Sequence, residues 1–168
     1  KNIRNPIEII EHTKLFTGRD IGTTGHGLKG KTHIFKYSSN NELKKLADLL
    51  NEYTERDGIE LGNIVLLSRV AIGNSKLANY LMAEGFKVKV LTDSNIRDFP
   101  FKTLAFSSIE DFKGLESDIV IVDIEDMDKS DFSGTLFYIA LTRVIYDLIM
   151  PVPKNKYKMV KQIYRNNL

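Results

Sequence analysis

Asp118-Ile-Val-Ile-Val-Asp-Ile124 is the stretch of this sequence that decides the fold. Four consecutive apolar residues are followed by an aspartate and a further isoleucine, which makes this the longest strongly apolar stretch among the predicted strands. Strands that carry apolar side chains on both faces are buried on both faces, as in parallel sheets covered by helices. We therefore place residues 118–124 at the centre of a mostly parallel sheet.

On both sides of this strand the sequence alternates between strand-like and helix-like patterns. Further strands are predicted at 33–38, 63–68, 87–91, 102–106 and 146–150, the last stopped by Pro151. Helices are predicted from Pro6 onward, from Ser39-Asn40 onward with leucines on one side, and over 75–84, 133–142 and 154–166. Strands that alternate with helices of about 10 to 15 residues predict an α/β fold with a mostly parallel, doubly wound sheet. Ligands of such sheets bind beyond the carboxyl ends of the strands.

The composition is that of an ordinary globular protein. The chain has 168 residues, of which 42% are hydrophobic and 27% charged, and this length allows a substantial core. Its formal net charge of +2 is too small to indicate nucleic-acid binding by itself. Cysteine is absent, which excludes disulfides and thiolate metal sites. His12, His26 and His33 lack metal-ligand spacing, so we expect loop or surface histidines and no metal site.

The ends and the apolar runs of the chain set its expected context. No apolar run approaches the roughly 18 residues of a membrane span, and no signal peptide is present, so we expect a cytoplasmic protein without a membrane partner. The sequence begins at Lys1 in a structured pattern, which suggests a segment of a longer protein. We expect one domain over 1–168, with a first helix region at 1–16, a glycine-rich loop at 17–32 and a terminal helix at 154–168.

Gly25-His-Gly-Leu-Lys-Gly-Lys-Thr32 matches the letters of a P-loop, and 119–123 looks like a Walker B strand. A working P-loop needs a strand before its glycines and a helix after them, so that helix amides face the phosphates. The residues before Gly25 do not resemble a strand, and those after Thr32 alternate like a strand. A self-contained P-loop ATPase that uses Lys31 and Thr32 is therefore the alternative interpretation.

Two segments near the end of the chain are the most informative for function. Residues 107–116 read Ser-Ser-Ile-Glu-Asp-Phe-Lys-Gly-Leu-Glu, and 136–143 read Leu-Phe-Tyr-Ile-Ala-Leu-Thr-Arg. A carboxylate such as Glu116 accepts hydrogen bonds from ribose hydroxyls, and a guanidinium such as Arg143 meets phosphate in a fork. In spelling and order these segments resemble motifs V and VI of superfamily I helicases of the UvrD/Rep type.

The resemblance covers most of the chain and implies the second RecA-like domain of such a helicase, a three-layer α-β-α sandwich without a P-loop. Asn2-Ile-Arg-Asn5 resembles the end of motif IV, which implies a phosphate contact for Arg4, while Ile3 replaces the usual aromatic residue. Residues 64–69 with Asn74-Ser75 resemble the motif that contacts the DNA backbone. Asn74 and Ser75 also suit the cap of the following helix.

The resemblance also implies roles for single residues. It assigns ATP binding to Gly114, Glu116, Arg4 and Arg143, with Arg4 and Arg143 acting on the terminal phosphate in catalysis. It assigns contacts to single-stranded DNA to a second set of residues, namely Arg69, Asn74, Ser75, Ser107, Ser108 and Lys113. Glu110 stands where the family often has histidine, and Val144-Ile145 replace the small and basic residues often found after the arginine.

The resemblance thus implies the C-terminal ATP-binding domain of an ATP-dependent DNA helicase or translocase. ATP and Mg²⁺ would be the cofactors, with Mg²⁺ held mainly by an N-terminal RecA-like domain of the same protein. That domain and the phosphate backbone of single-stranded DNA would be the partners, and this chain alone would not hydrolyse ATP. A non-catalytic RecA-like interaction domain is the second alternative.

Overall fold

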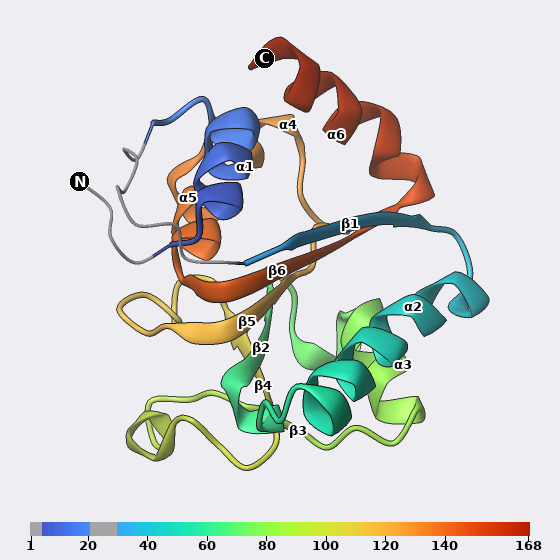
Figure 1. Ribbon diagram of the computed structural model, residues 1–168, viewed down its shortest axis with the longest axis vertical. Helices are drawn as coiled ribbons and strands as arrows, with labels where there is room; N and C mark the ends of the chain where they lie inside the picture. The colour runs from blue at the N-terminus through green and yellow to red at the C-terminus, as the bar shows by residue number, and fades with distance from the viewer. Residues whose placement is uncertain (1–4, 21–29) are drawn as a thin grey trace.

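The computed structural model describes residues 5–20 and 30–168. Its centre is a six-stranded sheet with the order β1-β6-β5-β2-β4-β3, in which every neighbouring pair is parallel. The strands are β1 (Thr32–Tyr37), β2 (Ile64–Ser68), β3 (Val88–Val90), β4 (Leu104–Ser108), β5 (Ser117–Val122) and β6 (Val144–Pro153). The predicted α/β class with a mainly parallel sheet is confirmed, and Figure 1 shows the sheet in the middle of the molecule.

Helices cover both faces of the sheet, which completes the predicted three-layer sandwich (Figure 1). One face is covered by α1 (Ile7–Thr17), α4 (Lys129–Ser133), α5 (Thr135–Thr142) and α6 (Lys154–Asn166), and the other by α2 (Asn40–Asn51) and α3 (Lys76–Ala83). None of the helices within 5–20 and 30–168 is long and apolar enough to cross a membrane.

The central position of β5 follows from its sequence, as predicted. Val120 and Val122 belong to the core beneath α1, α4, α5 and α6, whereas Ile119 and Ile121 belong to the core beneath α2 and α3. All four side chains are fully buried. Alternate residues of a strand point to opposite faces, so a strand with four consecutive apolar residues is expected to be covered on both faces.

The last strand differs from the prediction. β6 does not stop at Pro151 but continues to Pro153, paired with β1 along its whole second half. Its pairing with β5 is registered only as far as Ile149. The amide of Leu148 donates to the carbonyl of Lys31, on the side of β1. Because successive backbone amides of a strand point to alternate sides, the nitrogens of Pro151 and Pro153 point to the other side, where β5 has already ended. Neither proline therefore removes a hydrogen bond from the sheet.

Two further local features were not predicted. The short helix α4 follows β5 and begins with a capping box. The Asp128 carboxylate accepts from the backbone amide of Asp131, and the Asp131 carboxylate accepts from the backbone amide of Asp128. A π-helix, Glu52–Arg56, extends α2 by one turn and brings Tyr53 into the core. Single-turn π-segments are often found at functional sites.

The glycine-rich loop lies mostly outside the described residues, but its two ends are visible. Thr17 still belongs to α1, which Gly18 closes in the left-handed conformation at φ 69°. Lys31 immediately precedes β1, and Thr32 is the first residue of that strand. A P-loop threonine opens a helix. Thr32 opens a strand, so the described end of this segment lacks the geometry that the P-loop alternative requires.

After two neighbouring central strands, the chain continues to opposite faces of the sheet. β2 leads into α3 on one face, and β5 leads into α4 and α5 on the other. β2 and β5 are neighbours, so their carboxyl ends form the point at which ligands of doubly wound sheets commonly bind.

Candidate functional site

Most of the predicted DNA-contact residues lie at or just after the carboxyl ends of β2 and β4. These strands are adjacent and parallel, with Ser68 opposite Ser108, so the segments beginning at Arg69 and Ile109 leave the same edge of the sheet. The Arg69 guanidinium forms an ion pair of 2.6 Å with Asp131 of α4, and its side chain remains about one-third exposed. Asn74 lies between β2 and α3 and is exposed.

A buried carboxylate accepts hydrogen bonds from two serines at the carboxyl ends of the central strands. Asp123, the residue after β5, is 3% exposed and accepts hydrogen bonds from Ser75 Oγ at 2.8 Å and Ser68 Oγ at 3.3 Å. The Ser75 hydroxyl also accepts from the amide of Ala78 and thereby caps α3. Ser75 itself is fully buried. Its hydroxyl caps α3, as its position in the sequence suggested, and also donates to Asp123.

Ser107 and Ser108 end β4 in different environments. The Ser107 side chain is fully buried and donates to the carbonyl of Ser108 at 2.8 Å. Ser108 is half-buried, and its hydroxyl accepts from the amide of Asp111, which shapes the turn that follows. Of these two predicted DNA contacts, Ser108 is thus the accessible one.

Lys113 lies in the turn that runs from the carboxyl ends of the strands to their amino ends. The turn begins at the carboxyl end of β4 and ends at the amino end of β5, and its residues Ile109 and Phe112 are fully buried. Gly114 has φ 92°, a conformation that favours glycine, which explains the Lys-Gly pair. Lys113 is exposed. Because it precedes Gly114 directly, it lies nearer to the start of β5 than the other predicted DNA contacts do.

The predicted nucleotide residues Glu116 and Arg143 come together at the amino ends of β5 and β6. Each stands one residue before its strand, and the two first strand residues, Ser117 and Val144, are paired in register. The amide of Ser117 donates to the carbonyl of Arg143 at 3.1 Å. The expectation that ligands bind beyond the carboxyl ends therefore does not describe these two residues, which lie at the opposite edge.

The backbone on both sides of Arg143 is bound by the side chain of Asn5. Arg143 is the C-cap residue of α5, and its half-buried side chain has a buried Nε with no hydrogen-bond partner within residues 5–20 and 30–168. Asn5, which is 2% exposed, donates from Nδ2 to the carbonyls of Val144 at 2.6 Å and Thr142 at 3.3 Å. Arg4 lies outside the described residues. Its neighbour Asn5 nevertheless ties the start of the chain to both sides of Arg143.

A hollow of about 540 Å³ lies beside Glu116. It is lined by Phe99, Gly114, Leu115, Glu116 and Ile145. Volumes of roughly 300 to 1,000 Å³ are usual for small-molecule sites. Glu116 and Gly114 are thus placed on the wall of a cavity of ligand size.

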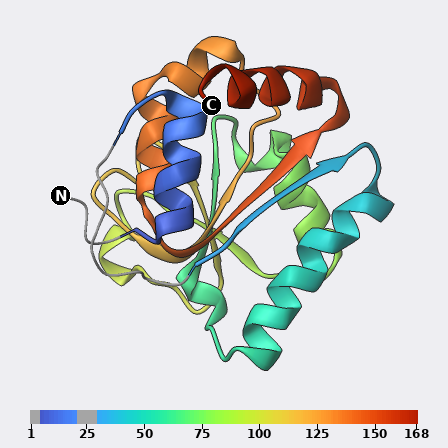
Figure 2. The ribbon, with the colours of Figure 1, turned by 45° about the horizontal axis from the view of Figure 1, so that its top comes forward.

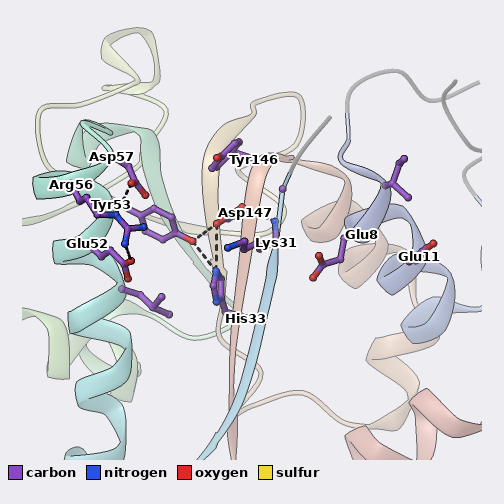
Figure 3. Close-up of a pocket in the computed structure, with 13 residues that line it drawn as sticks. Glu8, Glu11, Lys31, His33, Glu52, Tyr53, Arg56, Asp57, Tyr146 and Asp147 are labelled. Atoms are coloured by element: carbon purple, nitrogen blue, oxygen red, sulfur yellow. Dashed lines mark hydrogen bonds and ion pairs between the residues drawn. The ribbon is translucent and has the colours of Figure 1, made fainter. Parts of the chain in front are cut away.

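A second cavity, of about 660 Å³, opens at the amino ends of β1 and β6 and was missed by sequence reasoning (Figure 3). At its floor Asp147 accepts from the Tyr53 hydroxyl and, at 2.7 Å, from the amide of Lys31. His33 Nε2 lies 3.1 Å from the Tyr53 oxygen and 3.5 Å from Asp147 Oδ2. The one available signal was a lone aspartate in an otherwise apolar strand.

The electrostatics of this second cavity follow from burial and hydrogen bonding. Burial alone would raise the pKa of Asp147, but hydrogen bonds from His33, Tyr53 and the Lys31 amide together hold this pKa below its ordinary value. Burial, followed by the bond to Asp147, raises the pKa of Tyr53. Asp147 is therefore an anion at neutral pH and Tyr53 a neutral donor.

In the described part of the chain, no group of three or more His, Cys, Asp or Glu residues is placed to hold a metal ion. His33 belongs to the Asp147 cluster instead. His12 packs against the Phe16 and Tyr164 rings, and burial lowers its pKa. Neither is a loop histidine.

The chain was compared with known proteins. No protein-family model and no curated protein sequence matches it. Among solved structures it is similar to the C-terminal domain of a possible DNA helicase from Lactobacillus plantarum WCFS1, with a TM-score of 0.61 at 17% identity, over 91% of this chain and 88% of that one. At this identity the likeness establishes the fold. The C-terminal part of the Fun30 ATPase domain is similar at a TM-score of 0.47 and 10% identity, over 73% of this chain and 44% of that one.

Proposed function

We propose that this chain is the second RecA-like domain of an ATP-dependent DNA helicase or translocase of the UvrD/Rep type. One observation supports the proposal: Glu116 and Arg143 precede two strand residues that are paired in register, and Glu116 lines a cavity of about 540 Å³. Two residues of a predicted nucleotide site, 27 positions apart in sequence, become neighbours only in this fold. The likeness in fold to the C-terminal domain of a possible DNA helicase from Lactobacillus plantarum supports the helicase part of this proposal.

In the proposed mechanism the domain contributes charge and position. Arg143 would neutralise charge that develops on the terminal phosphate with its half-buried guanidinium. Glu116 would accept from the ribose, and Arg4 would supply a second guanidinium. Mg²⁺ and the P-loop contacts would come from the first RecA-like domain, so the isolated chain binds nucleotide weakly and does not hydrolyse it.

The proposed DNA contacts lie mainly at the carboxyl edge. Arg69, Asn74 and Ser108 would meet phosphates there, and Lys113 would do so nearer to the nucleotide residues. Ser75 and Ser107 are fully buried, and we assign them the positioning of this edge instead. A phosphate track of this kind binds single strands in a salt-dependent manner.

The test is a titration of the isotope-labelled chain with Mg·ATP, followed by NMR. We expect weak binding, with amide shifts concentrated at 114–117 and 143–146. Arg143→Gln should abolish these shifts, and the matched control Lys31→Ala should leave them unchanged.

Tight binding that Lys31→Ala removes, with shifts at 30–32, would establish the P-loop alternative in place of this proposal. No binding by the wild type and no effect of Arg143→Gln on the activity of the protein that contains both domains would favour a non-catalytic interaction domain.

A further inference from the structure

The terminal helix α6 carries a disproportionate share of the positive charge. Residues 154–168 contain five of the 24 basic residues of the chain and none of its 22 acidic residues. The remaining residues therefore carry a net charge of −3, although the whole chain carries +2. The basic character of this protein thus resides in one helix.

Four of these cations form a single line along the helix. We define the basic row as Lys154, Lys158, Lys161 and Arg165, which follow one another at spacings of four, three and four residues. Such residues lie on one face of an α-helix. All four are exposed, and the buried residues Val160 and Ile163 lie on the opposite side of α6, against the core. Figures 1 and 2 show α6 at the outer surface, with free space on its far side.

The basic row opposes the electrostatics of its own helix. Like charges three or four residues apart repel, and cations in the first helical turn oppose the helix dipole. The first turn of α6 contains Lys154 and Lys156 and no acidic residue. Lys156 donates to the carbonyl of Met127 at 2.7 Å, whereas no ion pair involves the basic row in 5–20 and 30–168. An arrangement that is locally unfavourable and uncompensated is typical of a binding surface.

An aromatic side chain lies beside the basic row. Tyr157 of α6 is 39% exposed, and the ammonium of Lys36 at the end of β1 lies 5.3 Å from the centre of its ring. Lys36 is also exposed and extends the positive surface onto the sheet edge. Exposed aromatic rings next to a line of cations are the elements with which proteins bind single-stranded nucleic acids, by stacking and by phosphate contact.

We propose that the basic row with Tyr157 is a second binding surface for the phosphate backbone of single-stranded DNA, separate from the predicted contacts around Arg69. The row extends over about 16 Å, and each of its four cations can contact one phosphate of a strand that runs along it. Arg69 follows β2 and pairs with Asp131 of α4, whereas the row lies on α6, so the two sets of cations belong to different elements. The inference rests on the proposed function only in its choice of DNA as the polyanion.

The test is the affinity of the purified 168-residue chain for a fluorescein-labelled oligo-dT, measured by anisotropy between about 50 and 200 mM salt. With four phosphates contacted, the row contributes a slope of about −2.8 to the plot of log affinity against log salt, or about 50-fold in affinity over this range. Replacing all four row residues with glutamine should remove that contribution. Tyr157→Leu, which keeps the apolar bulk, should lower affinity by about tenfold through lost stacking.

Matched variants separate the row from general charge. The control carries four substitutions of exposed lysines elsewhere, namely Lys44→Gln, Lys45→Gln, Lys87→Gln and Lys102→Gln. It should keep most of the affinity and the salt slope. The variant Lys154→Glu should bind DNA more weakly and yet melt at a higher temperature, because an acid in the first turn suits the helix dipole and pairs with Lys158 four residues on. A merely structural role of the row would move the two readouts together.

Three results would overturn the proposal. They are an unchanged salt slope in the fourfold row variant, an equal loss of affinity in the lysine control, and competition by polyglutamate as effective per charge as competition by oligo-dT. The last would assign the row to an acidic protein. Each of these results leaves the nucleotide shifts at 114–117 and 143–146 as they are, so failure of this inference and failure of the proposed function are distinguishable.

Discussion

Asp147→Asn should destabilise the domain more than any other single change of charge at the amino edge. The carboxylate is buried and accepts from three donors, the Tyr53 hydroxyl, the Lys31 amide and His33. An asparagine keeps one acceptor oxygen but presents an NH₂ group where a donor now points. Hydrogen bonds to charged groups contribute about 1.5–3 kcal/mol, and a buried group left unsatisfied costs about 1–3 kcal/mol. We expect a loss of about 2–4 kcal/mol in the free energy of unfolding.

The loss should depend on pH in a defined direction. The folded-state pKa of Asp147 lies below its ordinary value, so its ionised form stabilises the fold fully above the unfolded pKa of about 3.9. This stabilisation declines as the pH falls through the folded-state pKa. The difference between wild type and Asp147→Asn should therefore be full at neutral pH and disappear in strong acid.

Urea denaturation followed by circular dichroism at several pH values measures this difference. Asp48→Asn is the matched control, because Asp48 is exposed and paired only with Lys44, so its loss should cost at most about 0.5 kcal/mol. A difference below about 1 kcal/mol for Asp147→Asn at neutral pH, or one that grows toward acid, would refute the reasoning.

Three further substitutions test other parts of the structure by the same denaturation measurement. Ser75→Ala removes the cap of α3 and a donor to buried Asp123, and should cost about 2–3 kcal/mol; a cost near 0.5 kcal/mol would mean that the cap alone matters. Gly62→Ala should prevent folding or cost more than about 3 kcal/mol, because its Cβ would lie 1.5 Å from the Phe101 carbonyl oxygen, and a melting temperature equal to wild type would contradict this packing. Gly114→Ala should cost about 1–2 kcal/mol through its positive φ alone, since nothing lies within 4 Å of the added Cβ, and no loss would show that this turn adopts another conformation.

Much of the fold was predictable because the signals were local. The apolar run at 118–124 identified the central strand, and leucine spacing identified α2. The end of β6 was predicted wrongly because a proline was taken as the end of the strand. Whether a proline disrupts a sheet depends on the side to which its missing N–H would point, and that side is set by the neighbouring strands.

The site was predictable to a different degree. Resemblance selected Glu116 and Arg143, and only the pairing of β5 with β6 made them neighbours. The Asp147 cluster escaped prediction because its partners Tyr53 and Lys31 are 94 and 116 residues away in sequence. Burial of Ser75 and Ser107 also depends on packing, so the sequence alone left their exposure open.

The turn between β4 and β5 gives this domain a mechanical property. One covalent segment begins beside Ser108 at the carboxyl edge and ends at Glu116 at the amino edge, with Ile109 and Phe112 embedded in the core along the way. These two buried side chains anchor the segment between its ends, so it is not a slack tether. If ligands occupy both ends, each must change the affinity for the other by the same factor, because coupling between two binding equilibria is reciprocal.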